Sequence, residues 1–366
     1  MNLENDILKI STPGRVCLFG EHQDYLNLPI IASAISRRIF IQGKHRNDKF
    51  VNIQLPDIDS EEKFLLEDEL FYEIERDYFK SAINVLQRKG YTFSKGFDCI
   101  IHSNIPINAG TSSSSALMVS WINYLTRISD QSKEISSNEI ARLAYEAEVL
   151  EFSEPGGMMD HYSTAVGGII SLSSFPKIDL KKVNAKLGAF VLGNSNEPKD
   201  TKYILANVKN KVLDLTKLLK TNHPDFSLQY VNINEIEKYK SELNDNQYEL
   251  LYGTIRNRDI TYEAEKVLQS DITDHKYLGK LMTLHHNILR DVLKISTPKI
   301  ENMINAALEA GAYGAKINGS GGGGCMFAYA PENTESVLEA VKKISSNTFI
   351  VEVDKGTVEE IYEEVS

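Results

Sequence analysis

Hydrophobic periodicity along the chain predicts several amphipathic helices. Apolar residues recur at helical spacing from about residue 115, again within residues 136–152, and again within residues 298–310. The last of these helices begins after Thr297, where a proline takes the first helical position, and it stops at Gly311. Residues 202–290 also have a mostly helical pattern, and a shorter helix is expected at residues 334–343.

Short apolar runs between these segments predict β-strands. The predicted strands are residues 16–19, 30–42, 97–101, 190–192, 325–330 and 349–353. The acidic stretch 61–75 predicts a solvated helix face or a loop. Strands and helices mix without the regular alternation of a doubly wound sheet, so we expect an α+β fold. The serine- and lysine-rich stretch 171–186 suggests a division into two domains, residues 1–185 and 186–366.

Composition narrows the class of protein. With 366 residues the chain is long enough for about two domains. It carries 40 basic and 51 acidic residues, which argues against a nucleic-acid partner because neutralising a phosphate backbone needs a basic face. A small phosphate-containing ligand stays open, since backbone amides and one or two cations can bind it.

Cysteine usage and the N-terminal sequence bear on location. Cys17, Cys99 and Cys325 are too sparse for a disulfide framework or a zinc site, which favours a reducing compartment. The first nine residues lack the pattern of a signal peptide, and the apolar run at 28–35 is too short to cross a bilayer. We therefore expect a cytoplasmic protein without a membrane partner.

A small-residue loop precedes the first amphipathic helix. Residues 106–116 read Pro-Ile-Asn-Ala-Gly-Thr-Ser-Ser-Ser-Ser-Ala. Glycine at 110 allows close backbone approach, and the amides at the helix start favour an anion. The segment lacks the Gly-Lys-Ser/Thr of a Walker A loop, and a serine run before a helix is more often a solvated cap.

Three further segments concentrate glycine and polar residues. Residues 13–25 end an apolar strand in Gly-Glu-His-Gln-Asp-Tyr, which can bind sugar hydroxyls or form a plain polar turn. Metal ligation through Glu21, His22 and Asp24 has less support, because no partner with ligand spacing occurs elsewhere in the sequence. Residues 156–161 place Asp160 after two glycines and two methionines, as a general base, an electrostatic anchor or an ordinary turn residue. Residues 316–325 place a glycine run between strand-like flanks, which indicates close backbone approach rather than a flexible linker.

Together, and in this order, these segments resemble the motifs of the GHMP kinase superfamily. The first motif, Gly-Arg-x-x-x-x-Gly-Glu-His-x-Asp-Tyr, is similar to that of the galactokinases, as are residues 157–160, 194–196 and 286–291. The resemblance implies a two-domain fold, with an N-terminal domain like ribosomal protein S5 domain 2 and a ferredoxin-like C-terminal domain. It also implies ATP-dependent phosphorylation of the anomeric hydroxyl of a sugar, with Mg²⁺, in a monomer or weak homodimer.

The resemblance further implies roles for individual residues. Asp160 is the expected catalytic base, and Arg15 is expected to pair with it and to stabilise the phosphoryl group. The residues expected to bind the sugar are Glu21, His22, Asp24 and Gly157. The expected nucleotide-binding loop comprises Gly110, Thr111, Ser112, Ser113, Ser114 and Ser115. Ser114 and Glu148 are the expected magnesium ligands, and residues 319–324 are expected to support the phosphate loop.

Several positions depart from the galactokinase pattern. Residues 26–28 read Leu-Asn-Leu where galactokinases have Asn-Gly-Gly, Cys17 replaces a usual Asn, and Thr111 replaces a usual Leu. The third motif, residues 316–325, is closer to that of mevalonate kinases. Tyr203 does not have the spacing of the usual sugar-contacting tyrosine. Two alternatives to a galactokinase therefore stay open: a kinase for another sugar or a mevalonate-like alcohol, and a non-catalytic sensor of sugar and ATP.

Overall fold

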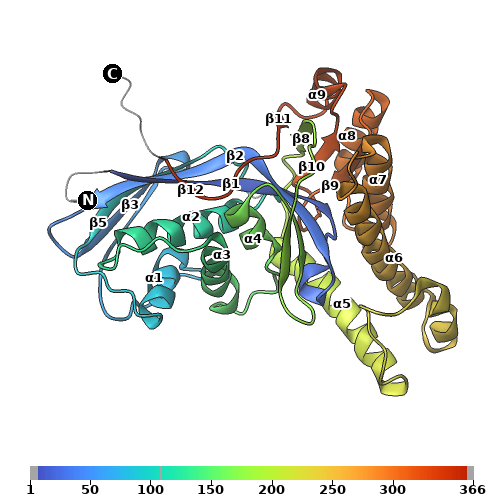
Figure 1. The fold of residues 1–366 in the computed structure, drawn as a ribbon, viewed down its shortest axis with the longest axis horizontal. Helices are drawn as coiled ribbons and strands as arrows, with labels where there is room; N and C mark the ends of the chain where they lie inside the picture. Colours follow the sequence, from blue (N-terminus) through green and yellow to red (C-terminus); the bar gives the residue numbers. More distant parts are fainter. Residues whose placement is uncertain (1–6, 108, 361–366) are drawn as a thin grey trace.

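The computed structural model describes residues 7–107 and 109–360, which form two β-sheets with helices packed on them (Figure 1). The strands of the first sheet are β1 (Leu8–Phe19), β2 (Ile30–His45), β3 (Phe50–Leu55), β4 (Ser60–Leu65), β5 (Phe97–Ser103), β6 (Ile169–Ser173), β7 (Asp179–Val183) and β12 (Val358–Glu359). Their order is β12-β1-β2-β5-β3-β4, and β6 pairs with both β2 and β7. β3 and β5 run parallel, whereas the other paired strands of this sheet are antiparallel.

Four helices cover one face of this sheet (Figure 1). They are α1 (Tyr78–Arg88), α2 (Ser113–Ile128), α3 (Ser137–Tyr145) and α4 (Met159–Val166). The apolar stripe of α2 faces the sheet, so that Trp121 and Tyr124 are completely buried against Phe97 of β5. Burying such large rings removes much apolar surface from water and anchors α2, and therefore the loop before it, to the sheet.

The second sheet is smaller and antiparallel. Its strands are β8 (Phe190–Asn194), β9 (Gly314–Ile317), β10 (Cys325–Tyr329) and β11 (Thr348–Val351), in the order β11-β8-β10-β9. The helices of this half are α5 (Thr201–Asn222), α6 (Asp245–Leu268), α7 (His275–Asp291), α8 (Pro298–Glu309) and α9 (Thr334–Lys342). This strand order, with α8 before β9 and α9 before β11, is that of a ferredoxin-like β-α-β-β-α-β unit.

One hydrophobic core joins the two sheets. Val16, Leu18 and Phe19 of β1 share a buried cluster with Phe190 and Phe327 of the second sheet. The end of β1 therefore lies where the sheets meet, and the polar residues that follow it are held at this junction. The chain finally returns to the first sheet, where β12 pairs with β1.

The structure confirms most of the predicted elements and corrects one. The predicted helices correspond to α2, α3, α5–α9, and the six predicted strands lie within β1, β2, β5, β8, β10 and β11 or overlap them. The stretch 61–75 is only partly a loop, because residues 61–65 belong to β4. Strands β3, β6, β7 and β12 and helices α1 and α4 were not anticipated, and the division at residue 185 stays a prediction.

Candidate functional site

A cavity of about 430 Å³ lies at the junction and is lined by residues from all four glycine- or serine-containing segments. The predicted site residues that line it are Arg15, Glu21, His22, Asp24, Gly110, Ser112, Ser113, Ser114, Ser115, Glu148, Gly157 and Asp160. Thr111 is instead fully buried beside the cavity. Its carbonyl accepts a hydrogen bond from the Arg15 amide, and its hydroxyl donates to the Pro106 carbonyl. The fold thus brings together residues that are far apart in sequence.

The loop before α2 leaves the start of that helix open. Ser112 takes a left-handed conformation at φ 60°, and its side chain does not cap the helix. The first amides of a helix have no intrahelical acceptor, so they are available to an anion. The third motif presses against this loop: a Cβ on Gly319 would lie 2.7 Å from the Gly110 carbonyl oxygen, and one on Gly110 would lie 2.6 Å from the Asn318 carbonyl oxygen. Only glycines allow this contact between the two loops.

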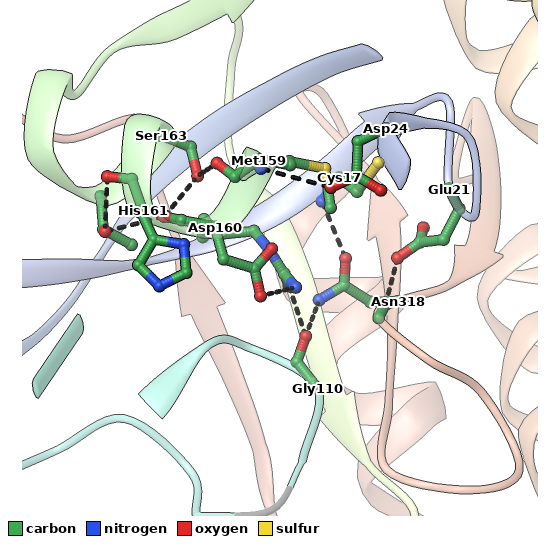
Figure 2. Close-up of polar contacts among 12 residues, drawn as sticks. Cys17, Glu21, Asp24, Gly110, Met159, Asp160, His161, Ser163 and Asn318 are labelled. Atoms are coloured by element: carbon green, nitrogen blue, oxygen red, sulfur yellow. Dashed lines mark hydrogen bonds and ion pairs between the residues drawn. The ribbon is translucent and has the colours of Figure 1, made fainter. Parts of the chain in front are cut away.

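Arg15 and Asp160, which both line the cavity, form an ion pair (Figure 2 labels Asp160). The guanidinium contacts both carboxylate oxygens, Nε to Oδ1 and Nη2 to Oδ2, each at 2.8 Å, and it also donates to the Gly110 carbonyl. Burial by itself would raise the pKa of Asp160, but the charge and hydrogen bonds of Arg15 hold that pKa below its ordinary value. Asp160 is therefore ionised at neutral pH, and its side chain retains 27% exposure toward the cavity.

Asp24 is the second carboxylate at this point, and its environment differs. Its side chain accepts hydrogen bonds from the amides of Tyr25 at 2.9 Å and Met159 at 3.3 Å. Burial and the nearby charge of Asp160 raise the pKa of Asp24 to about 6. A Cβ on Gly157 would lie 1.9 Å from Asp24 Oδ2, so the glycine provides the room for this carboxylate.

Glu21 and His22 connect the first motif to the third. Glu21 bonds to the Lys316 ammonium and to the Gly319 amide, and all three lie in the interior. His22 Nε2 lies 3.0 Å from the Ser320 carbonyl oxygen and Nδ1 lies 2.6 Å from the Tyr25 hydroxyl. Burial lowers the pKa of His22 to about 4, so the ring is neutral, with Nε2–H donating to the carbonyl and Nδ1 accepting from the tyrosine.

Glu148 and Ser114 supply oxygen atoms to the same cavity. Glu148 lies in a π-helical turn, Glu146–Leu150, and its carboxylate is 9% exposed. Ser114 is exposed in the first turn of α2. A carboxylate and a hydroxyl are hard oxygen donors of the kind that Mg²⁺ accepts together with substrate phosphates and water, so this pair fits a magnesium ion.

Lys199 is a cavity residue that the sequence motifs did not single out. Its ammonium lies 3.2 Å from the Ser320 hydroxyl and forms no ion pair with a carboxylate within the described part of the chain. Burial lowers the pKa of Lys199 to about 8. The only signal was its position shortly after the Asn-Ser-Asn segment 194–196, and Tyr203 in the same region is 67% exposed.

Part of the cavity lining is apolar. The side chains there are Ile39, Leu55, Ile58, Ile101, Ile107 and Leu117. Such a surface suits a planar, weakly polar group more than a polyhydroxylated one. Sequence reasoning missed this region because its members come from five separate segments, each of which looks like ordinary core.

Comparisons with known proteins identify the family of this chain. Family models match residues 77–168 (GHMP kinases N terminal domain), residues 264–347 (GHMP kinases C terminal) and residues 4–45 (galactokinase galactose-binding signature). Mevalonate kinase of Pyrococcus horikoshii is 30% identical over 94% of this chain and 95% of its own length. This chain belongs to the GHMP kinase family. The resemblance seen in the motifs and the α+β fold expected from it are therefore confirmed.

The names of other relatives of this GHMP kinase refer to two different substrates. Galactokinase of Haemophilus influenzae is 26% identical over 93% of this chain and 89% of its own length. The crystal structure of Lactococcus lactis galactokinase complexed with galactose superposes with a TM-score of 0.85 at 21% identity, covering 98% of this chain and 96% of that one. Methanococcus jannaschii mevalonate kinase superposes with a TM-score of 0.72 at 23% identity, covering 96% and 99%.

The family assignment makes the protein a kinase for a sugar or another alcohol. GHMP kinases use ATP as phosphoryl donor, generally with Mg²⁺. Among the described residues, no helix is both long and apolar enough to cross a bilayer.

Proposed function

We propose that this kinase transfers the γ-phosphoryl group of ATP to the anomeric hydroxyl of a monosaccharide, and that galactose is its substrate. The observation that carries the proposal is the arrangement of Asp24 and the Arg15–Asp160 pair beside the open start of α2. It puts two carboxylates of different pKa next to a site for phosphates. The match of residues 4–45 to a galactose-binding signature supports a sugar acceptor.

In the proposed reaction Asp160 orients the acceptor hydroxyl and receives its proton. A lowered pKa makes Asp160 a weak base. In a loose phosphoryl-transfer transition state the attacking oxygen needs little activation until it bonds to phosphorus, so a weak base suffices when it is well positioned. Arg15, which holds Asp160 in place, offsets the charge on the transferring group.

The other proposed roles are to bind and orient the sugar, the nucleotide and Mg²⁺. Asp24, beside the backbone at Gly157, accepts hydrogen bonds from sugar hydroxyls. Glu21 and His22 are already bonded within the protein, so they act on the sugar site by holding the first motif in place. The amides of residues 110–115 hold the phosphates, and the apolar part of the lining accommodates the adenine. Ser114 and Glu148 hold Mg²⁺, which when bound neutralises phosphate charge.

The proposal is tested by coupled ADP release with Mg-ATP and a panel of acceptors. The panel contains galactose, other neutral hexoses, arabinose, hexuronic acids, N-acetylhexosamines and mevalonate. We expect selective turnover of galactose. Turnover of a different sugar without turnover of galactose would overturn galactose as the substrate and leave a kinase for that other sugar. Sugar binding by calorimetry without any ADP release would instead indicate a non-catalytic sensor.

A second candidate acceptor is an acid such as mevalonate. The observation that favours it is Lys199, a partly buried lysine of the cavity. Within residues 7–107 and 109–360, the neutral Ser320 hydroxyl is the only side-chain partner of its ammonium. A buried cation without a counter-ion is costly, and a carboxylate on the acceptor would offset that cost. The similarity to mevalonate kinases over nearly the whole chain is consistent with this candidate.

Replacing Lys199 by Met separates the two candidates. If the acceptor is an acid, we expect its KM to rise about 10–150-fold, because a hydrogen bond to a charged group contributes about 1.5–3 kcal/mol. The KM of wild-type enzyme for that acid should also rise above about pH 8, where the ammonium loses its proton. If the acceptor is a neutral sugar, neither change in acceptor KM is expected.

The matched control for this experiment is Lys202→Met. Lys202 lies at the same cavity but is already paired with Glu75 at 3.1 Å and Glu154 at 3.4 Å. Its removal should leave the acceptor KM unchanged. An equal rise in both variants would contradict a specific role for Lys199.

A further inference from the structure

The carboxylate of Glu148 is held by a single side chain. Glu148 lies in the π-helical turn Glu146–Leu150, which directly continues α3. π-turns inside helices insert one extra residue and commonly occur at functional sites. The turn brings Glu148 to the cavity while leaving its side chain only 9% exposed. A carboxylate in such a place needs a hydrogen-bond donor to stay ionised and ordered.

That donor is His161. Its Nε2 lies 2.7 Å from Glu148 Oε2, and the imidazole is 2% exposed. Because an ionised carboxylate only accepts, Nε2 must carry the proton. Tyr145 packs edge-on against the imidazole at 5.4 Å between ring centroids, which restricts rotation of the ring. Among the described residues, no other donor contacts Glu148, so Oε1 is left without a protein partner.

His161 also follows Asp160 directly in the first turn of α4 (Figure 2). The same turn therefore fixes the proposed base and the group that orients Glu148. α4 packs on α3 and α2, and its next polar side chains, Ser163 and Thr164, bond back to carbonyls within α4. The position of Glu148 relative to Asp160 is thus set through one rigid helix turn.

We propose that His161 is a positioning residue that fixes one oxygen of Glu148, so that the other oxygen is presented to the Mg²⁺ of the bound nucleotide. This inference rests on the proposed role of Glu148 as a magnesium ligand. Donors that hold metal-binding carboxylates typically contribute about 10–100-fold to metal affinity. His161 acts through Glu148 and need not touch nucleotide or acceptor.

The test is Mn²⁺ binding to the ADP complex, followed by the loss of the free Mn²⁺ signal in electron paramagnetic resonance. In His161→Ala we expect affinity to fall about 10–100-fold. His161→Gln, which keeps an N–H donor, should recover part of this loss. In ADP-release assays, His161→Ala should raise the Mg²⁺ concentration needed for half-maximal rate more than it lowers the rate at saturating Mg²⁺.

The matched control is His286→Ala. His286 is also buried and bonded to a glutamate, with Nε2 2.9 Å from Glu301 Oε1, but it does not line the cavity. This control should lose stability without losing Mn²⁺ affinity. If circular dichroism shows that His161→Ala is unfolded, His161→Gln is compared with His161→Asn. The Mn²⁺ affinity should fall further in His161→Asn, because the shorter side chain cannot bring its amide to Glu148.

Two outcomes separate this inference from the proposed function. If Glu148→Gln binds Mn²⁺-ADP as tightly as wild type, Glu148 is not a metal ligand. Its proposed role and the proposed role of His161 are then both overturned. If Glu148→Gln weakens binding while folded His161 variants bind like wild type, the role of Glu148 stands and the role of His161 is overturned.

Discussion

Asp160→Asn is expected to lower kcat by about 10²–10⁴-fold while the acceptor still binds. The amide preserves the shape of the side chain but cannot take the acceptor proton. It also removes the negative charge that faces Arg15 through two 2.8 Å contacts. Because the charge of Asp160 helps to raise the pKa of Asp24, the same variant should lower the pKa of Asp24 from about 6.

The measurements for Asp160→Asn are coupled ADP release and calorimetric titration with the acceptor. Asp354→Asn is the matched control, since Asp354 pairs with Arg38 at 2.8 Å and is similarly exposed, 24% against 27% for Asp160. Both variants leave a buried arginine without its partner, so both should lose some stability. Only Asp160→Asn should lose turnover, and unchanged turnover in it would refute the assigned role.

Lys316→Met is expected to have the largest effect on stability. The Lys316 ammonium is fully buried and pairs with Glu21, whose side chain is 2% exposed, and it also donates to the Cys17 carbonyl at 2.8 Å. Removing one partner of a buried ion pair leaves an uncompensated charge and typically costs about 3–5 kcal/mol. We expect the free energy of unfolding, measured by urea denaturation, to fall by about this amount.

A second variant identifies the source of this loss. Lys316→Met combined with Glu21→Gln removes both charges and should recover part of the stability. The surface control is Lys342→Met, whose partner Glu339 is 66% exposed, and its unfolding midpoint should hardly change. A single variant as stable as wild type would show that the buried pair does not hold the first and third motifs together.

The elements that sequence reasoning found are those with a strong local pattern. The stripe of α2 and the apolar runs of β1 and β2 are readable because each segment buries a regular face by itself. β7, with its two consecutive lysines, and β4, with its two glutamates, have mostly exposed side chains. They are strands because β6 and β3 present backbone partners to them, and no local pattern contains that information.

The sequence likewise predicted some residues of the candidate site and missed others. The glycine and serine loops were found because special backbone geometry and helix starts require particular residue types. Lys199 was missed because a single lysine in a polar segment looks like surface. The bond between Glu21 and Lys316 spans 295 positions and has no sequence signature in the absence of a fold.

The sequence by itself determined the family, the order of its motifs and the residue types available for phosphoryl transfer. Only the tertiary structure decided how those residues differ from one another. Asp160 and Asp24 are both aspartates near glycine-rich turns, yet Arg15 lowers the pKa of one, whereas burial and the neighbouring charge raise that of the other to about 6. Burial, nearby charges and hydrogen bonds depend on how distant segments pack, and together they set the protonation state of each group.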